Sequence, residues 1–482
     1  MAIMNDKPNI RDEFKRTKIV CTLGPSTKDP EVLRGMVQAG MNVARLNLSH
    51  GNLVEHLENI AKIRSISAEM GTQIACMFDT RGPDVRIGEL VGDDIELPEG
   101  HEITLDLDTS TGSADRVGVT HPELLGLLKV GDAVFLNDGM MELHVAAVEK
   151  EKVKCVVMTA GLLKPRKGIN IPGKTIPLPV LTDEDIHDLR EGIKHGIDYI
   201  SASFVNSPED VHFIRGAVRG GDVGIIAKIE SARGVQNLES IIDVADGVMV
   251  ARGDLGIEIP PEEVPGVQKR MIRLCREARK PVITATEMLE SMTRSPRPTR
   301  AEITDVANAV LDGTSAVMLS AETAVGLYPV KVVEMMARIC VRAESDMPPM
   351  PLKMEVAKKA DGFGMIRSGI TRAACELAND INAPVIICVT DSGATAALFS
   401  HLRTSQPVLA CAPNERVAQK LALYWGVLPI VVDVNNSQTG LLTQGINAAK
   451  ARGMVKSGDR VVFTGNLSGK GGATNLLATV EV

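Results

Sequence analysis

Residues 223–252, VGIIAKIESARGVQNLESIIDVADGVMVAR, contain two short apolar runs separated by a more polar stretch. The runs are VGIIAKIE (223–230) and DGVMVAR (246–252), and each ends in a charged residue. Nearly continuous apolar runs of this length are typical of parallel strands that are buried on both faces. The stretch between them is amphipathic with helical spacing. The segment therefore predicts a strand, a helix and a second strand parallel to the first.

The same rhythm extends to both sides of this segment. Similar apolar runs are TKIVCTL (17–23), MNVARLN (41–47), QIACMFD (73–79), DYISASF (198–204), KPVITAT (280–286) and GTSAVMLS (313–320). Helical patterns such as DPEVLRGMVQA (29–39) lie between them. The runs make eight strand–helix units over about 250 residues, which matches the number of units and the length of a (β/α)8 barrel. We predict an α/β fold with this TIM barrel over residues 17–84 and 175–345.

Two further parts of the chain have different patterns. Within residues 85–174, segments such as MELHVAAV (141–148) alternate apolar and polar residues between Gly and Asp turns, which predicts a small inserted all-β domain. Residues 355–482 contain runs such as PVIICVT (384–390), which predict an open α/β domain. Its last segment, NLLATVEV (475–482), is expected to be a mixed edge strand. Residues 1–16 form a polar N-terminal segment.

Composition excludes several classes of partner. The 482 residues carry 53 Lys and Arg against 61 Asp and Glu, a net charge of −8, and only 2% aromatic residues. The negative charge and the few aromatic residues argue against nucleic-acid binding, which uses clustered Lys and Arg side chains and aromatic side chains that stack on bases. No apolar run reaches the roughly 18–20 residues of a membrane span, and the first residues resemble no secretory signal. The eight cysteines are scattered without a CxxC pair, so we expect buried thiols in a reducing cytoplasm.

Polar side chains follow the predicted strands where each strand ends. In a (β/α)8 barrel these ends meet at one face, where active sites are built. Any single Ser, Thr or Asp at such a place is often only a helix cap. The residues at the strand ends are Arg45, Asn47, Ser49, His50, Asp79, Thr80, Arg81, Arg86, Lys228, Glu230, Arg252, Asp254, Thr286, Ser320 and Glu322.

Lys228 and Glu230 are two residues apart in one predicted strand, so both side chains point into the barrel mouth. Glu230 and Asp254 follow consecutive strands. Two carboxylates from neighbouring strands suit Mg²⁺ or Mn²⁺, which also take substrate oxygens and water. A salt-bridged pair at the barrel rim is the alternative interpretation. The GDLG motif (253–256) adds backbone N–H groups beside a helix start, which favours an anionic ligand.

Ordered motifs on seven of the predicted strands resemble the pyruvate kinase family over residues 17–482. They are TKIVCTLGPST (17–27), NVARLNLSHG (42–51), FDTRGPDVRIG (78–88), KGINIPG (167–173), AKIES (227–231), VARGDLGIEIP (250–260), ATEMLESM (285–292), PTRAEITDVANAVLDG (298–313) and MLSAETAVGLYP (318–329). The resemblance implies transfer of a phosphoryl group from phosphoenolpyruvate to ADP, giving ATP and pyruvate, the last step of glycolysis. It also implies a mobile lid, a regulatory C-terminal domain and a homotetramer.

The resemblance also implies roles for single residues. Lys228 would stabilise the transferring phosphoryl group and the enolate oxygen, and Arg45 would bind the phosphate. Glu230 and Asp254 would hold Mg²⁺ or Mn²⁺. Gly253, Asp254 and Thr286 would bind the substrate carboxylate, and Thr286 or Ser320 with a water relay would protonate the enolate.

The resemblance further implies sites for K⁺ and for the nucleotide. The K⁺ ligands would be Asn47, Ser49, Asp79 and Thr80. The nucleotide would contact Asn47, His50, Arg86 and Lys167, and its bound Mg²⁺ would contact Asp138.

Three positions depart from the family pattern. Glu287 replaces the usual Gln after Thr286, which adds a carboxylate near the barrel mouth. Asp84 stands at the position where an acidic residue goes with K⁺ dependence, although the family usually has Glu. The loop TDSGAT (390–395) carries Asp391 where the sugar-phosphate activator loop often has a cation. Ser392, Gly393 and Thr395 would still bind an effector phosphate at a helix N-terminus, or would form a plain helix cap.

Two other functions use the same residues. A lyase that cleaves a C–C bond to a pyruvate enolate would also need Mg²⁺ with Glu230 and Asp254. It would have no nucleotide to bind at Asp138, Arg45 and Lys167. A metabolite sensor or scaffold that kept the fold would be expected to lose Lys228, Glu230 or Asp254, and all three are present.

Overall fold

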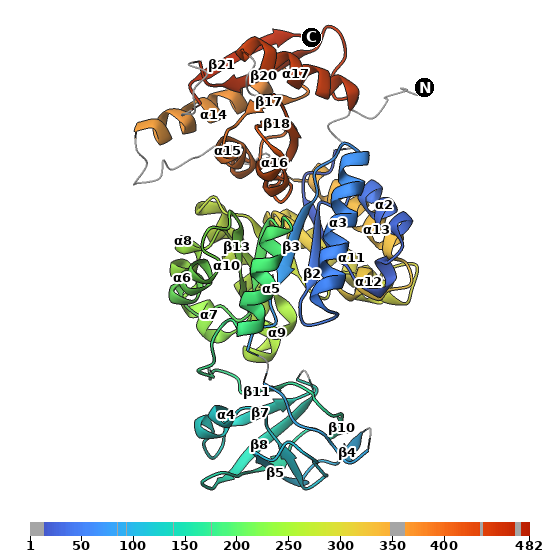
Figure 1. Cartoon of the computed structure of the whole chain (residues 1–482), viewed down its shortest axis with the longest axis vertical. Helices are drawn as coiled ribbons and strands as arrows, with labels where there is room; N and C mark the ends of the chain where they lie inside the picture. The colour runs from blue at the N-terminus through green and yellow to red at the C-terminus, as the bar shows by residue number, and fades with distance from the viewer. Residues whose placement is uncertain are drawn as a thin grey trace.

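The barrel lies between the lid and the C-terminal domain along the long axis of the molecule (Figure 1). The computed structural model describes residues 14–83, 85–92, 94–137, 139–174, 176–347, 362–433, 437–467 and 474–482. Asp84 and Asp138, for which the sequence predicted roles, lie outside the described residues. Within these ranges no helix has the length and apolar character needed to cross a membrane.

Eight parallel strands close into the predicted barrel. They are β1 (Lys18–Thr22), β2 (Val43–Asn47), β3 (Ala75–Asp79), β12 (Tyr199–Ala202), β13 (Gly224–Ile229), β14 (Gly247–Ala251), β15 (Val282–Ala285) and β16 (Ala316–Leu319), in the order β1-β16-β15-β14-β13-β12-β3-β2. Nearly every residue of these strands is buried, which explains the continuous apolar runs in the sequence. The prediction of a TIM barrel is confirmed.

Helices surround the barrel and begin at residues suited to cap them. They are α2 (Pro30–Ala39), α3 (Leu53–Glu69), α5 (Asp183–Lys194), α6 (Pro208–Ala217), α7 (Ala232–Gln236), α8 (Leu238–Val244), α9 (Arg252–Glu258), α10 (Val264–Glu277), α11 (Arg300–Asp312), α12 (Ala321–Ala324) and α13 (Pro329–Ser345), with short 3-10 turns η1 (Pro25–Thr27), η2 (Pro261–Glu263) and η3 (Glu290–Thr293). The side chains of Thr182, Ser207 and Thr299 each accept a hydrogen bond from the first turn of their helix. Gly40 ends α2 at φ +118°, a conformation that favours glycine.

The lid is a separate β-structure with its own hydrophobic core. Its strands are β4 (Ile95–Leu97), β5 (Glu102–Asp106), β6 (Arg116–Gly118), β7 (Ala133–Leu136), β8 (Met141–Val148), β9 (Val153–Val157), β10 (Gly161–Leu163) and β11 (Ile169–Asn170), with one short helix, α4 (Pro122–Leu127). Six of these strands form one sheet in the order β11-β7-β8-β9-β5-β6, and β10 pairs with β4.

The C-terminal domain is an open α/β sheet, as predicted. Strands β17 (Ile386–Val389), β18 (Val408–Ala412), β19 (Val427–Val431), β20 (Arg460–Gly465) and β21 (Leu476–Glu481) lie in the order β19-β18-β17-β20-β21, with helices α14 (Gly362–Asp380), α15 (Ala394–Leu402), α16 (Glu415–Leu421) and α17 (Gln438–Ala451). Strand β21 pairs antiparallel with β20, so the mixed edge strand is confirmed.

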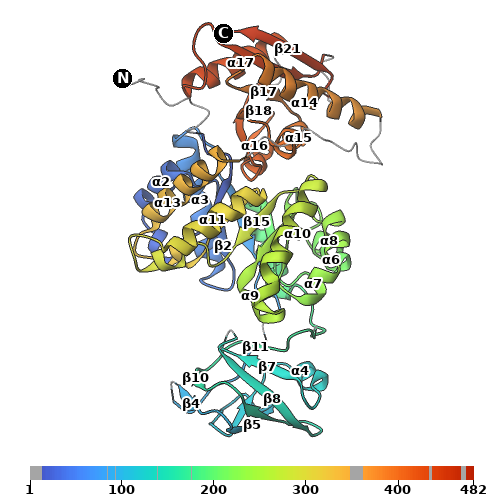
Figure 2. The same cartoon turned by 180° about the vertical axis from the view of Figure 1, so that it is seen from behind.

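The C-terminal domain covers the amino ends of the barrel strands (Figure 2). Leu423, which follows α16, is fully buried in the same hydrophobic cluster as Met77, Ile226 and Met249 inside the barrel. The first residue of β12 also binds this segment, since the Tyr199 hydroxyl donates to the carbonyl oxygen of Lys420 at 2.6 Å. This docking leaves the carboxyl ends of the strands facing the lid.

Candidate active site

Lys228 lies at the centre of the charged groups in the barrel mouth. Its Nζ is 2.9 Å from Oε1 of Glu230 and 3.1 Å from Oδ1 of Asp79. It also donates a hydrogen bond of 2.8 Å to the Ser203 hydroxyl. Burial opposes the charge, but the carboxylates of Asp79 and Glu230 outweigh it and raise the pKa of Lys228. The side chain is therefore a buried and permanently protonated ammonium group.

Glu230 combines deep burial with a second carboxylate nearby. Burial and the field of Asp254 raise the pKa of Glu230 to about 7, although Lys228 and the hydrogen bond from Phe204 oppose the shift. One Glu230 oxygen accepts a hydrogen bond of 2.7 Å from the backbone N–H of Phe204. Two carboxylates that repel each other in a buried mouth would be stabilised by a divalent cation.

Asp79 links Lys228 to a second cation, Arg45. The Nε of Arg45 lies 2.8 Å from Oδ2 of Asp79, and its NH1 donates to the Thr22 hydroxyl at 2.9 Å. Burial opposes the ionised form, yet Arg45 and Lys228 hold the pKa of Asp79 below its usual value. The three side chains come from strands β2, β3 and β13 and form one buried charge network.

The backbone is strained where β15 ends. Thr286 and Glu287 have φ values of +62° and +53°, which is an outlier for a β-branched residue such as Thr. The Thr286 hydroxyl accepts a hydrogen bond of 2.9 Å from the backbone N–H of Gly253. Strain of this kind concentrates at functional sites, where the surrounding structure maintains it.

Arg252 maintains this conformation and was given no role by the sequence interpretation. Its Nε donates to the carbonyl oxygens of Ala285 and Thr286 at 3.1 and 3.2 Å. Its NH1 lies 2.8 and 2.7 Å from the two carboxylate oxygens of Asp305. The only sequence signal for this arrangement was the position of Arg252 at a strand end.

A cavity of about 480 Å³ lies between the strand ends and the lid. It brings together most of the predicted site residues, namely Arg45, Asn47, Ser49, His50, Asp79, Thr80, Arg86, Lys167, Lys228, Glu230 and Asp254. Gly253, Thr286 and Ser320 are not among the residues that line it. Gly253 and Thr286 adjoin it through Asp254, whereas the backbone N–H of Ser320 donates to Glu322 at 2.6 Å.

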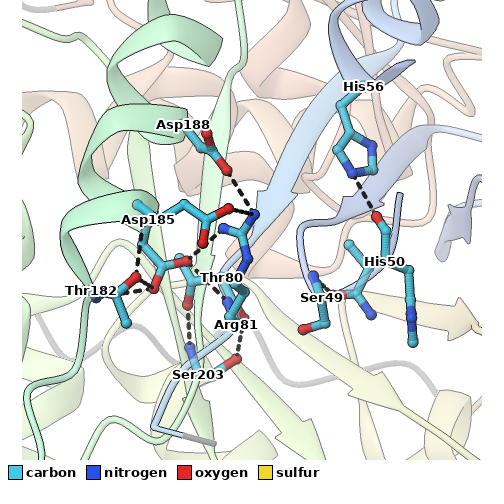
Figure 3. Close-up of polar contacts among 11 residues, drawn as sticks. Ser49, His50, His56, Thr80, Arg81, Thr182, Asp185, Asp188 and Ser203 are labelled. Atoms are coloured by element: carbon cyan, nitrogen blue, oxygen red, sulfur yellow. Dashed lines mark hydrogen bonds and ion pairs between the residues drawn. The ribbon is translucent and has the colours of Figure 1, made fainter. Parts of the chain in front are cut away.

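Arg81 also borders this cavity, but its guanidinium binds acidic side chains of helix α5 (Figure 3). Its guanidinium lies 3.2 Å from Asp185 and 2.9 Å from Asp188. The neighbouring residue, Thr80, is joined to Ser203 by hydrogen bonds of 3.0 and 2.7 Å. These contacts attach the end of β3 to α5 and β12 directly before the chain enters the lid. Figure 3 also shows the ring of His56 bound to the carbonyl oxygen of His50, at 2.9 Å.

The predicted effector loop is a helix start with internal hydrogen bonds. Gly393, at φ +88°, precedes α15 and donates its N–H to the Thr390 hydroxyl at 3.0 Å. The Thr395 hydroxyl is buried and lies 2.6 Å from the hydroxyl of Thr474, whereas Ser392 is exposed. Effector binding at these residues stays a prediction.

Comparisons with known proteins agree with this architecture. Residues 14–333 match the family model of the pyruvate kinase barrel domain, and residues 368–480 match that of the pyruvate kinase alpha/beta domain. Pyruvate kinases of Staphylococcus saprophyticus and Staphylococcus haemolyticus are 41% and 42% identical over 470 residues, covering 96% of this chain and 80% of each relative. A crystal structure of a pyruvate kinase from Cryptosporidium parvum has a TM-score of 0.90 and 36% identity, covering 98% of this chain and 97% of that chain. The chain therefore belongs to the pyruvate kinase family.

Proposed function

We propose that this chain transfers the phosphoryl group of phosphoenolpyruvate to ADP, giving ATP and pyruvate, in the cavity between barrel and lid. The observation that carries the proposal is the ammonium of Lys228, held between Asp79 and Glu230. Phosphoryl transfer depends mainly on positioning and on neutralising charge in a site that excludes water. A buried, fixed cation with a second cation, Arg45, on the same carboxylate supplies that neutralisation.

Lys228 and Arg45 would divide the charge of the substrate. Phosphoenolpyruvate carries a phosphate and a carboxylate, and loss of the phosphoryl group leaves an enolate oxygen. Lys228 would stabilise the transferring group and that oxygen, while Arg45 would bind the phosphate. Because Asp79 holds both cations, it would fix their spacing before substrate arrives.

Glu230 and Asp254 fit a divalent cation, which we propose is Mg²⁺ or Mn²⁺. Burial and the field of Asp254 raise the pKa of Glu230, and a bound cation would offset both effects and favour the ionised carboxylate. No cluster of three or more His, Cys, Asp or Glu side chains that could hold a metal occurs in the described ranges. Two carboxylates suit Mg²⁺, which takes its other ligands from substrate and water, better than zinc. When bound, the cation would act as a Lewis acid toward substrate oxygens.

The carboxylate of the substrate would bind at Gly253, Asp254 and Thr286. In support, the Thr286 hydroxyl accepts a hydrogen bond from the Gly253 N–H, next to Asp254, which lines the cavity. Either Thr286 or Ser320, with a water relay, would supply the proton to the enolate.

The nucleotide and K⁺ would occupy the side of the cavity formed by β2, β3 and the lid. We assign K⁺ to oxygens of Asn47, Ser49, Asp79 and Thr80, because a hard monovalent cation requires oxygen ligands. Asn47, His50, Arg86 and Lys167 would contact nucleotide phosphates, and all four line the same cavity. Asp138 would reach a second, nucleotide-bound Mg²⁺.

The lid would close over this cavity and exclude water during transfer. We propose domain limits at residues 17–84 and 175–345 for the barrel, 85–174 for the lid and 355–482 for the C-terminal domain, preceded by the segment 1–16. Supporting this division, the lid has a hydrophobic cluster separate from that of the barrel.

We further propose a cytoplasmic homotetramer that is regulated through its C-terminal domain. All eight cysteines are buried and free, which suits a reducing compartment. An effector phosphate would bind at Ser392, Gly393 and Thr395. Light scattering after size-exclusion chromatography tests the tetramer, and rates measured with sugar phosphates and AMP test the effector.

A coupled assay for pyruvate tests the proposed reaction. We expect pyruvate from phosphoenolpyruvate only when ADP and Mg²⁺ are both present, with a higher rate in K⁺ than in Na⁺. Pyruvate release from a longer 2-oxo acid without ADP would instead indicate a C–C lyase. No turnover with either substrate would indicate a sensor or scaffold.

A further inference from the structure

A cluster of basic side chains lies at the seam between the barrel and the C-terminal domain, far from the cavity of the proposed reaction. Arg276 belongs to the end of α10, and Arg279 and Lys280 follow it. His401 and Arg403 lie at the end of α15. Together they line a small cavity of about 20 Å³. We call these five residues the seam cluster.

Arg403 is the member whose bonding is incomplete. Its side chain lies over the Trp425 ring, 4.5 Å from the ring centre, and only 9% of the residue is exposed. Its NH2 donates to the carbonyl oxygens of Gly313 and Thr314 at 2.6 and 3.3 Å. Its Nε and NH1 are buried and have no hydrogen-bond partner among the described residues. Buried charged N–H groups without partners are costly, so this geometry calls for an acceptor.

Arg276, Arg279 and Arg403 converge on the same place, whereas the Lys280 ammonium donates to the carbonyl oxygens of Ile242 and Asp243. Gly313 lies between two of them, because its carbonyl binds Arg403 and a Cβ built on it would be 3.1 Å from NH1 of Arg276. Burial and the fields of Arg279, Arg276 and Arg403 lower the pKa of His401 to about 4. Three guanidinium groups therefore surround a neutral imidazole.

The carboxylate that acts on Arg403, that of Glu344, already accepts hydrogen bonds from other groups. Glu344 is the acidic residue whose field favours the charged form of Arg403. Its two oxygens accept hydrogen bonds from the backbone N–H groups of Thr17 and Arg16, at 2.6 and 2.8 Å. No ion pair joins Arg403 to an acidic side chain within the described part of the chain. Arg403 therefore carries a positive charge with no ion-pair partner among the described residues.

We propose that the seam cluster binds a small inorganic anion of halide size, which joins the C-terminal domain to the barrel. The cavity volume matches one particle the size of a water molecule, so a phosphate ester is too large for it. A water molecule would satisfy the N–H groups of Arg403 but would leave the positive charge of Arg403 without an ion-pair partner. An anion accepts from Arg403 on one side of the seam and lies in the field of Arg276 and Arg279 on the other.

Bromide scattering locates such an anion directly. Crystals of the full-length protein are grown or soaked in sodium bromide, and an anomalous difference map is calculated. We expect a peak in the cavity within hydrogen-bonding distance of NH1 or Nε of Arg403. A map with no anomalous peak there, or with a water molecule in its place, overturns the proposal.

Chloride dependence of thermal stability gives a second test in solution. At constant ionic strength, replacing gluconate by chloride should raise the melting temperature of the native protein by a few degrees, because an anion that binds only the folded state stabilises it. Arg403→Met and Arg276→Met should lose this rise, and Arg342→Gln, at an exposed ion pair on α13, should keep it. The Arg276→Met variant and the bromide map test the site even when Arg403→Met does not fold. An equal rise in the Met variants and the native protein contradicts the proposal.

Discussion

The guanidinium of Arg252 donates to the backbone carbonyl oxygen of Thr286, and this bond connects the ends of two neighbouring barrel strands. Thr286 is held at φ +62°, a conformation that its side chain disfavours. The same guanidinium is fixed by both carboxylate oxygens of Asp305. Arg252 is therefore a positioning residue for the proposed seat of the substrate carboxylate.

Replacing Arg252 by Lys should weaken substrate binding more than it affects stability. A lysine keeps the charge but cannot bond Thr286 and Asp305 through a planar fork. We expect KM for phosphoenolpyruvate to rise about tenfold, equivalent to about 1.4 kcal/mol, while KM for ADP changes little. Steady-state kinetics with each substrate measure this split. Arg270→Lys, at an exposed ion pair with Glu239, is the matched control. An equal rise in both KM values would mean a general structural effect.

Replacing Asp254 by Asn should raise the requirement for divalent cation. The amide keeps an oxygen ligand but loses the charge that, with Glu230, favours the cation. We expect the Mg²⁺ concentration for half-maximal rate to rise about 10–100-fold. The stabilisation of the protein by Mn²⁺ in thermal unfolding should weaken in parallel. Glu263→Gln, at an exposed glutamate nearby, should change neither value. Unaltered Mg²⁺ dependence in Asp254→Asn would remove Asp254 from the metal site.

Replacing Leu423 by Ala should loosen the contact between the C-terminal domain and the barrel. Leu423 is fully buried inside the barrel, so its truncation should cost about 2–5 kcal/mol. Urea unfolding measures the loss. Leu467→Ala, at a residue that is 72% exposed, is the control and should cost almost nothing. Equal unfolding midpoints for the two variants would show that Leu423 does not anchor the domain.

The destabilisation of the folded protein that burial of Lys18 causes should depend on pH. This residue is fully buried and donates a hydrogen bond of 2.6 Å to the carbonyl oxygen of Val427. Burial lowers the pKa of Lys18 to about 7, below its value in the unfolded chain. Between pH 7 and the unfolded pKa the unfolded chain holds the extra proton, so the stability of the native protein rises with pH there.

The variant Lys18→Met has no ionisable group at this position, so its stability lacks this dependence on pH. It should be more stable than the native protein at pH 7, and the difference should shrink by about 1.4 kcal/mol per pH unit toward pH 10. Urea unfolding of both proteins at several pH values measures the difference. A difference that stays constant with pH would show that Lys18 is not deprotonated in the folded state.

The strands and the charged pair in the barrel mouth could be predicted because they depend on local pattern. Apolar runs buried on both faces mark each barrel strand, and a spacing of two residues places Lys228 beside Glu230. The lid strands β4, β6, β10 and β11 span only two or three residues each, too short for any pattern to show.

Other contacts could not be predicted, because they join residues that are far apart in the sequence and leave no local sequence pattern. Arg81 follows β3 like a site residue, yet it binds acidic residues of α5 about one hundred positions later. The role of Arg252 depends on the left-handed backbone at Thr286 and Glu287, which ordinary residue preferences oppose. Leu423 lies in an apolar stretch that reads as part of its own domain, although its side chain fills the barrel.

The central claim is that the Lys228 ammonium neutralises charge on the transferring phosphoryl group. Its most direct test is the single-turnover rate of pyruvate formation by Lys228→Met, with folding checked by circular dichroism. We expect the rate to fall by at least about 10²–10³-fold, the usual cost of losing one group that stabilises developing charge. Lys194→Met, at an exposed lysine on α5, should retain the native rate. A rate for Lys228→Met equal to that of the Lys194→Met control would contradict the account.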